Sequence, residues 1–305
     1  MPHKLKNLAA SVRQKLLDLA RSRNEDFGLI LVKYGLERIL YRLSRSKHRD
    51  TFVLKGALLF ELWTKHTYRA TRDAGFLARG DNSPERFVGI FKELCVIEVE
   101  PDGLTFDADS VKAERITEDA DYEGVRVTFT ARLERARIPI QIDIGFGDAI
   151  TPAPLETQYP TLLPAPNPRL LTYPKETVVA EKFEAMVKLG IANSRMKDFY
   201  DLEALSRNLD FDGKMLGEAI RKTFERRGTE LPAGGTPVAF TPEFYTDTDK
   251  KKQCAAFGTR NATFVTKTEL KEVVGNVKQF LTPVATALLD SSPFTKRWEP
   301  GGPWH

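Results

Sequence analysis

The sequence has little cysteine and no long apolar run, and these two absences exclude several classes of protein. Cys95 and Cys254 are the only cysteines in 305 residues, and their wide separation fits no metal-ligand spacing. No apolar segment is long enough to cross a membrane, and the basic, amphipathic N-terminus lacks the continuous apolar core of a signal peptide. We therefore expect a cytoplasmic protein with no membrane partner.

Internal repeats and low-complexity tracts are also missing. Hydrophobic residues make up 41% of the chain and charged residues 29%, as in ordinary soluble globular proteins. The net charge of +4 permits a nucleic-acid partner but does not require one. A length of 305 residues accommodates two domains.

Helical and strand patterns are mixed in the first half of the chain. Apolar residues at helical spacing predict helices over residues 6–22, 27–44 and 83–96. Two alternating runs, "VRVTFTARL" and "RIPIQIDIGFGD", follow these helices and are joined by a short connection. They predict an antiparallel hairpin.

Proline is concentrated at the middle of the chain. Six prolines fall within residues 151–168, and we expect 151–173 to be a linker or a segment wrapped across the surface. Helical patterns dominate afterwards, and the last helix is predicted over 268–289. The predicted fold class is α+β, with an α/β domain over 1–150 that begins with helices and a mainly helical domain over 174–305.

The stretch "RATRDAGFLARG" has the character of a short strand that carries one acid, Asp73. Successive side chains of a strand point to opposite faces, so positions 73 and 75 share a face. Two carboxylates in that arrangement can hold a metal ion, but position 75 is glycine. Asp73 is therefore either part of a metal site that lacks one ligand or an ordinary strand acid paired with Arg69 or Arg72.

A strand, a turn and a helix are predicted just before this stretch, at 52–54, Lys55-Gly56 and 57–64. Small residues at Gly56 and Ala57 let backbone N–H groups approach a phosphate near the start of a helix. Most glycines in such positions serve only the turn, so this signal is weak by itself.

Asp143 lies on the polar face of the second hairpin strand, together with Gln141 and Gly145. On a half-exposed sheet such an acid is usually only solvated. If its strand lies beside the strand of Asp73, however, two acids converge on one edge.

A predicted helical hairpin over residues 174–206 carries the last cluster of charges. Lys182 lies off the apolar stripe of its first helix, and Asp198 and Asp201 are neighbours on one face of its second. A functional cluster and a set of surface ion pairs, each worth roughly 0–1 kcal/mol, both fit this pattern. We expect Lys182 to be largely buried in a cleft between the domains and close to a carboxylate, because an ammonium group removed from water needs a partner.

Four segments together resemble the AbiEii toxin family of bacterial toxin–antitoxin and phage-defence systems. They are "FVLKGALLFELW", "RATRD", "IDIGFGD" and "YPKETVVAEKFEAMVKLGIANSRMKDFYDL". The resemblance covers roughly residues 30–290, and the last segment is the most specific. The chain is similar, more distantly, to the mycobacterial nucleotidyltransferase toxins.

The resemblance implies a nucleotidyltransferase fold in the N-terminal domain, with a mixed sheet. The family has an Asp-x-Asp motif whose first acid matches Asp73 and whose second position holds Gly75 here. The implied catalytic residues are Asp73, Lys182, Asp198 and Asp143, the implied nucleotide-binding residues are Lys55, Gly56, Ala57 and Arg72, the implied metal ligands are Asp73 and Asp143, and Lys197 and Asp201 are secondary candidates.

The resemblance also implies an activity and its partners. The expected reaction transfers a nucleotide from a nucleoside triphosphate to an RNA acceptor, the 3′ end of tRNA, with two Mg²⁺ ions held by carboxylates. A cognate protein antitoxin is an expected partner. The RNA would follow a basic surface, and two basic clusters are candidates that are equally compatible with solvated helix faces: Arg38, Arg42, Arg45, Lys47 and Arg49, and Arg221, Lys222, Arg226 and Arg227.

Gly75 has three explanations at this point. It marks a natural degenerate homologue, it is an inactivating change, or another acid such as Asp81 takes its place. On the first two, the chain is inactive or nearly so. The alternative function is a non-catalytic nucleotide- or RNA-binding protein on the same fold. We expect Asp73, Asp143, Lys182 and Asp198 to converge on one cleft between the two domains.

Overall fold

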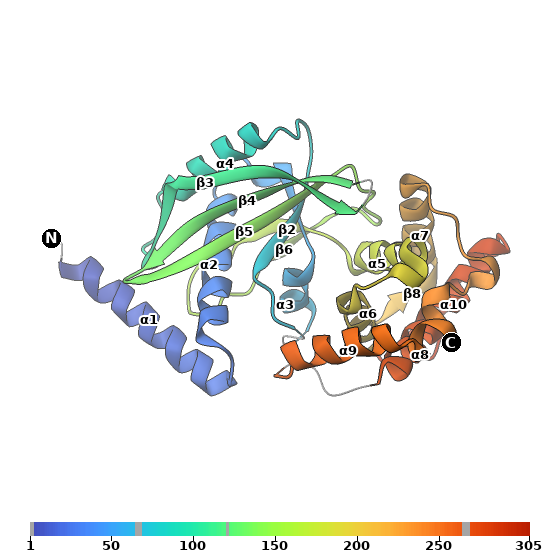
Figure 1. The fold of residues 1–305 in the computed structure, drawn as a ribbon. Coiled ribbons are helices and arrows are strands. Elements are labelled where there is room, and N and C mark those ends of the chain that lie inside the picture. The colour runs from blue at the N-terminus through green and yellow to red at the C-terminus, as the bar shows by residue number, and fades with distance from the viewer. Residues whose placement is uncertain (1–2, 65–68, 120–121, 264–268) are drawn as a thin grey trace. The chain divides into compact units, whose positions relative to one another are not determined.

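The structure is a computed structural model that describes residues 3–64, 69–119, 122–263 and 269–305 (Figure 1). The chain divides into two compact units, and each is described on its own. The first contains residues 1–62, 70–147 and 155–172, and the second contains residues 63–69, 148–154 and 173–305. Each unit is therefore assembled from several stretches of the chain, unlike the continuous ranges predicted for the domains.

Within the described residues, a seven-stranded mixed sheet forms the frame of the first unit. Its strand order is β3-β4-β5-β2-β1-β7-β6, in which β2–β5 and β1–β7 are parallel pairs and the other neighbours are antiparallel. The strands are β1 (Phe52–Lys55), β2 (Asp73–Ala78), β3 (Leu104–Asp119), β4 (Tyr122–Leu133), β5 (Ala136–Phe146), β6 (Leu155–Gln158) and β7 (Arg169–Thr172). The predicted hairpin is confirmed as β4 and β5.

One face of this sheet is apolar because side chains alternate along each strand. On β5 the isoleucines at 138, 140, 142 and 144 are all buried. Helix α2 (Phe27–Ser44) approaches them closely at Gly35, where an added Cβ atom would lie 2.7 Å from Ile140 Cδ1. Helix α4 (Pro84–Val96) covers the same face, and the ring of its Phe91 lies 5.8 Å from the ring of Phe129 on β4. The opposite face of the sheet is left polar.

The second unit is mainly helical. The rings of Trp298 and Trp304 pack against Phe280 at centroid distances of 4.9 and 5.8 Å, close to its apolar centre. Its helices of five or more residues are α5 (Lys175–Leu189), α6 (Met196–Asn208), α7 (Gly213–Arg227), α8 (Pro242–Thr246), α9 (Thr248–Arg260) and α10 (Leu270–Leu289), and its two short strands are β8 (Phe211–Asp212) and β9 (Arg297–Trp298). The α+β class predicted from the sequence is confirmed.

Several predicted helices agree with the structure. Asp26 fixes the start of α2, because its carboxylate accepts a hydrogen bond of 2.8 Å from the backbone N–H of Leu29. The first helix is α1 (His3–Arg23), slightly longer than predicted. The helix expected over 57–64 is instead a 3₁₀ turn, η2 (Ala57–Leu59), followed by the single turn α3 (Phe60–Trp63). Position 268, at the start of the last predicted helix, lies outside the described residues.

The proline-rich segment contributes to the sheet. Its strands β6 and β7 form a hairpin, and β7 pairs in parallel with β1. The loop between them is held to α2, because the Leu162 N–H donates to Glu37 Oε2 at 2.6 Å and Arg38 Nη2 donates to the Pro166 carbonyl at 3.0 Å. Of the segment that was expected to be a linker or to wrap across the surface, residues 155–172 are therefore part of the first unit, and residues 151–154 and 173 belong to the second.

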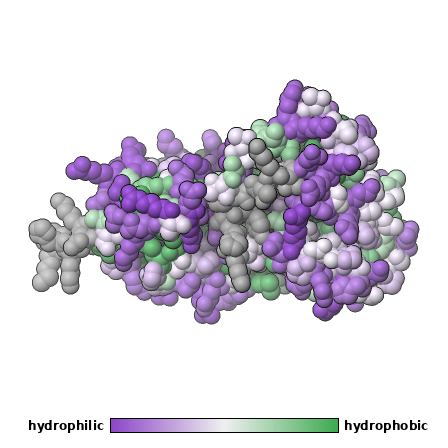
Figure 2. All heavy atoms as spheres, turned by 90° about the horizontal axis from the view of Figure 1, so that it is seen from below, coloured by the Kyte–Doolittle hydropathy of each residue, from purple (hydrophilic) through white to green (hydrophobic). Residues whose placement is uncertain are grey.

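None of the described helices combines the length and the apolar character that a membrane crossing needs. Hydrophilic side chains predominate on the face shown in Figure 2, and apolar ones are interspersed among them. Cys95 and Cys254 are both free and buried.

Glu37 gives the first unit a dependence on pH. Its side chain is only 2% exposed, and burial raises its pKa from 4.5 to about 7, although the adjacent Arg38 opposes the change. The folded state therefore holds this proton at pH values where the unfolded chain releases it. As a result, the stabilisation is present below pH 4.5 and is lost as the pH rises to about 7.

We predict that Glu37→Gln reduces this pH dependence. The amide still accepts the Leu162 N–H but has no proton to lose, so its unfolding free energy falls less between pH 5 and pH 8 than that of the parent chain. The difference is on the order of 3 kcal/mol. Urea denaturation at both pH values measures it, and identical pH dependence in the two proteins contradicts the prediction.

Candidate functional site

The polar face of the sheet brings together the acids singled out in the sequence. In the parallel pair β2–β5, Asp73 lies opposite Gln141 and Gly75 lies opposite Asp143. The strand of Asp143 is therefore the neighbour of the strand of Asp73, as the convergence of two acids required. Arg126 of β4 lies opposite Asp143 on its other side.

Asp143 already forms an ion pair with the guanidinium of Arg126. Arg126 donates from Nε to Oδ1 and from Nη2 to Oδ2 of this carboxylate, both at 2.8 Å. Gln141 Nε2 adds contacts of 3.3 and 3.2 Å to the same two oxygens. These hydrogen bonds raise the pKa of Arg126, and the negative charges of Asp143 and Asp73 act in the same direction. Asp143 is thus part of a bidentate ion pair.

The side chain of Lys55 passes over Gly75, the position where a second acid was expected. Lys55 lies opposite Gly75 on β1. An added Cβ atom at Gly75 would lie 3.5 Å from Lys55 Cγ, and one at Gly145 would lie 3.0 Å from Lys55 Nζ. The Lys55 side chain therefore runs over β2 on the polar face and ends beside β5, in space that both glycines leave open.

The residues present do not fit two Mg²⁺ ions. Mg²⁺ needs several oxygen ligands in near-octahedral geometry. Asp73 is a carboxylate without an ion pair in the described part of the chain, Gly75 offers no ligand, and both oxygens of Asp143 accept from Arg126. Among the described residues, His, Cys, Asp and Glu side chains form no cluster of three that suits a metal ion.

The turn after β1 has the backbone that its glycine allows. Gly56 has a φ of +80°, which is in the region that side chains other than glycine rarely adopt. A Cβ atom here would meet nothing within 4 Å, so the turn is open on that side. Ala57 starts the 3₁₀ turn η2 directly afterwards. Arg72 is exposed at the entry to β2.

The second unit holds the charges of the predicted helical hairpin, now seen as α5 and α6. Lys182 of α5 lies 2.6 Å from Asp198 Oδ1 and 2.8 Å from Asp201 Oδ2. Arg69 donates to both oxygens of Asp201, at 2.9 and 3.2 Å, and Arg195 Nε lies 2.8 Å from Asp198 Oδ2. Five charged groups therefore form one network of alternating sign.

The carboxylates of this network are buried, and its charges are set by its own pairs. The side chains of Asp198 and Asp201 are 1% and 2% exposed, and that of Lys182 is 14% exposed. Burial alone would lower the pKa of Lys182, but the two carboxylates outweigh it and the pKa is raised. Burial alone would raise the pKa of Asp201, but Lys182 and Arg69 lower it to about 2. The expectation of a buried lysine beside a carboxylate is confirmed, and the surface ion-pair alternative is wrong.

Lys197 differs from these residues because its side chain is exposed. Partial desolvation and the positive charges of Lys182 and Arg195 lower its pKa, while Asp198 opposes the change. Asp73 and Asp143 belong to the first unit, and Lys182 and Asp198 belong to the second. Their convergence on one cleft stays a prediction.

Both basic clusters proposed as RNA surfaces are largely neutralised. Arg38 and Arg42 are 1% and 6% exposed, and Arg42 Nη1 donates to Asp102 at 2.7 Å. The interpretation of these two arginines as surface contacts is wrong. Arg221 pairs with Glu218 on the exposed face of α7, and Arg227 Nη1 donates to the buried Glu184 at 2.7 Å.

Sequence reasoning missed Arg126 and the path of the Lys55 side chain. The alternation of "VRVTFTARL" already placed Arg126 on the polar face of its strand. It could not show that Asp143 is the opposite residue, because the register is a property of the assembled sheet.

Comparisons with known proteins identify a family. The model of the family described as "Nucleotidyl transferase AbiEii toxin, Type IV TA system" matches residues 38–276. No curated protein sequence matches the chain. Two solved structures from Helicobacter pylori are similar. The first, described as that of a candidate nucleotidyltransferase, has 14% identity, a TM-score of 0.49 and coverage of 86% of this chain and 96% of its own. The second, JHP933, has 12% identity, a TM-score of 0.43 and coverage of 86% and 97%.

We predict that Lys182→Met lowers the unfolding free energy by about 3–5 kcal/mol, because it removes the cation between two buried carboxylates. The matched control is Lys175→Met on the same helix, whose partner Asp210 is exposed and whose ion pair contributes at most about 1 kcal/mol. Urea denaturation of both variants measures the difference, and equal losses contradict the prediction.

Proposed function

This chain belongs to the AbiEii nucleotidyltransferase toxin family of type IV toxin–antitoxin systems, and on that premise we propose what it transfers and how far it retains activity. The proposed reaction moves a nucleotide from a nucleoside triphosphate to the 3′ end of tRNA, and a cognate antitoxin opposes it. We further propose that the chain with glycine at position 75 has little activity, because the second acid of an Asp-x-Asp pair belongs there.

One observation carries this proposal. The β2–β5 register puts Gly75 directly opposite Asp143, with Asp73 on the same face. A carboxylate at position 75 would extend from β2 beside both acids. An acid at position 75 would therefore complete a group of three carboxylates on the polar face.

The residues that surround this position supply positive charge instead. In nucleotidyl transfer, an RNA hydroxyl forms a bond to the α-phosphorus and pyrophosphate leaves, so negative charge develops on the phosphate oxygens. Fixed cations aimed at those oxygens stabilise such charge. Lys55 lies on the correct face for this role, whereas the guanidinium of Arg126 is occupied by both oxygens of Asp143. We assign the Lys182 network a positioning role, since its ammonium is occupied by two carboxylates.

A second candidate function is nucleotide or RNA binding without catalysis. The bidentate Arg126–Asp143 pair favours it, because this pair withdraws the third acid from any metal. A protein that only binds phosphate has no need of an acid pair. The transfer activity of a variant with an acid at position 75 therefore distinguishes the two functions.

We predict that Gly75→Asp raises transfer of labelled nucleotide from nucleoside triphosphates to total RNA at least tenfold, and that the gain requires Mg²⁺. The backbone at Gly75 has no positive φ, but the new Cβ atom would lie 3.1 Å from the Lys55 carbonyl oxygen, so β1 has to shift by a few tenths of an ångström. Adding Arg126→Gln frees Asp143, and Mg²⁺ should then raise the melting temperature of the double variant.

Three outcomes decide between the functions. Gly75→Asp combined with Asp73→Ala is the control and should be inactive. Equal activity in the parent chain and in Gly75→Asp would show that the second carboxylate is dispensable. If the folded Gly75→Asp and double variants are inactive with all four nucleotides, the binding function is favoured.

A further inference from the structure

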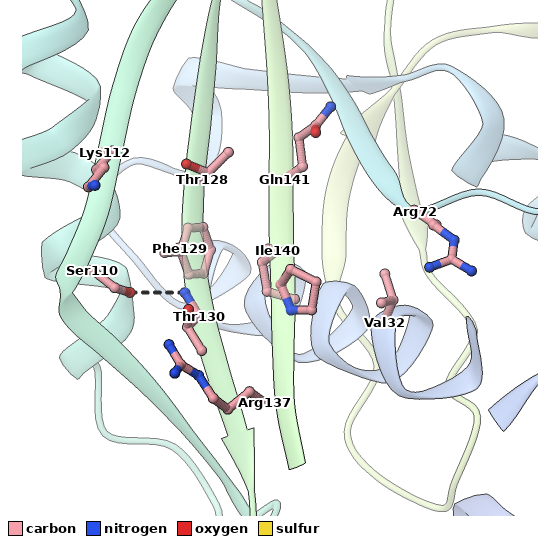
Figure 3. A pocket seen from close by; sticks show the side chains of 11 residues that line it. Val32, Arg72, Ser110, Lys112, Thr128, Phe129, Thr130, Arg137, Ile140 and Gln141 are labelled. Atoms are coloured by element: carbon pink, nitrogen blue, oxygen red, sulfur yellow. Dashed lines mark hydrogen bonds between the residues drawn. The ribbon is translucent and has the colours of Figure 1, made fainter. Parts of the chain in front are cut away.

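We propose that a basic hollow on the polar face of the sheet binds the phosphate backbone of a single-stranded RNA. The hollow has a volume of about 640 Å³ and lies over β3, β4 and β5 (Figure 3). Its polar lining includes Arg72, Lys112, Arg137, Ser110, Thr128 and Gln141. This proposal rests on the proposed function for the identity of its ligand, but its binding chemistry is independent of catalysis.

The charge of the hollow is of one sign. Its basic side chains come from three separate segments: Arg72 precedes β2, Lys112 lies on β3 and Arg137 lies near the start of β5. All three are exposed, and none forms an ion pair within the part of the chain that the structure describes. The described lining residues include no carboxylate. Three uncompensated cations around one depression attract a polyanion.

The second basic cluster of the sequence provides a contrast. Arg221 and Lys222 are also exposed on one helix face, but Glu218 and Glu225 lie within 3.3 Å of their charged groups. Their net charge is thereby cancelled locally. The three cations of the hollow keep their charge available for a ligand.

The spacing of the cations favours a strand over a single nucleotide. Neighbouring strands lie about 4.8 Å apart, so Lys112 on β3 and the start of β2 beside Arg72 are separated by about 14 Å across the sheet. Along β5, Gln141 is four positions after Arg137, which is about 13 Å. The backbone positions that carry these cations are therefore spread over roughly 14 by 13 Å, an area that suits several successive phosphates of a nucleic-acid strand.

The hollow adjoins the two acids of the polar face, Asp73 and Asp143. Gln141 lines it, lies opposite Asp73 on β2 and contacts Asp143 with its amide. Arg72 is the residue before Asp73. An RNA strand bound along the hollow therefore has one end next to the position where the acids of the sheet gather. This is the place that an acceptor hydroxyl has to reach.

The test compares two charge-removing double variants of the otherwise unchanged chain. Lys112→Gln with Arg137→Gln removes two cations of the hollow, and Arg221→Gln with Lys222→Gln removes two neutralised cations of α7. Binding of a fluorescent single-stranded RNA is measured by anisotropy at several salt concentrations. We expect the hollow variant to bind at least tenfold more weakly. Its slope of log K against log salt should fall by about 1.4, which is about 0.7 for each lost phosphate contact. The α7 variant should match the parent chain.

A second arm distinguishes RNA from nucleotide. ATP binding to the same proteins is measured by calorimetry, and we expect it to be unchanged in the hollow variant. Loss of ATP binding with intact RNA binding assigns the hollow to the triphosphate and overturns the proposal. Equal weakening of RNA binding in both double variants, or an unchanged slope in the hollow variant, overturns it too. Because no catalytic step is measured, failure of Gly75→Asp to gain activity leaves this result intact.

Discussion

The parallel pairing of β2 with β5 is the constraint on which the polar face depends. Its register is fixed by burial on the other face, where Phe76 is 1% exposed and packs edge-on against Phe52. A slip of one residue would move Phe76 into water and Asp73 into the apolar core. The same contacts that stabilise the sheet therefore set Gly75 opposite Asp143.

The polar face of this sheet is basic where its family leads one to expect acids. Arg126 neutralises Asp143, Lys55 crosses position 75, and further cations surround the adjoining hollow. The charges of the second unit are arranged differently, because its lysine and aspartates are removed from solvent and form ion pairs with one another. Exposed uncompensated charge favours ligand binding, whereas enclosed compensated charge fixes the geometry of two helices.

The parts of the fold that the sequence predicts are those with a local cause. Asp26 and the apolar spacing after it define α2, and strict alternation defines the β4–β5 hairpin. Strand β3 was not predicted, because a shift in its pairing between Asp107 and Lys112 interrupts the alternation. The burial of Arg38 depends on a segment far away in the chain, and the partner of Arg126 depends on the register of the hairpin. The alternation of a single strand contains neither.

Position 75 also has an evolutionary consequence. A single base can exchange codons for aspartate and glycine, so an aspartate at position 75 is one mutation away. The neighbours of the glycine occupy the space beside it: Lys55 extends over it and Arg126 binds the acid opposite. A carboxylate at position 75 would therefore meet side chains arranged without one, and each of those contacts makes the glycine harder to replace.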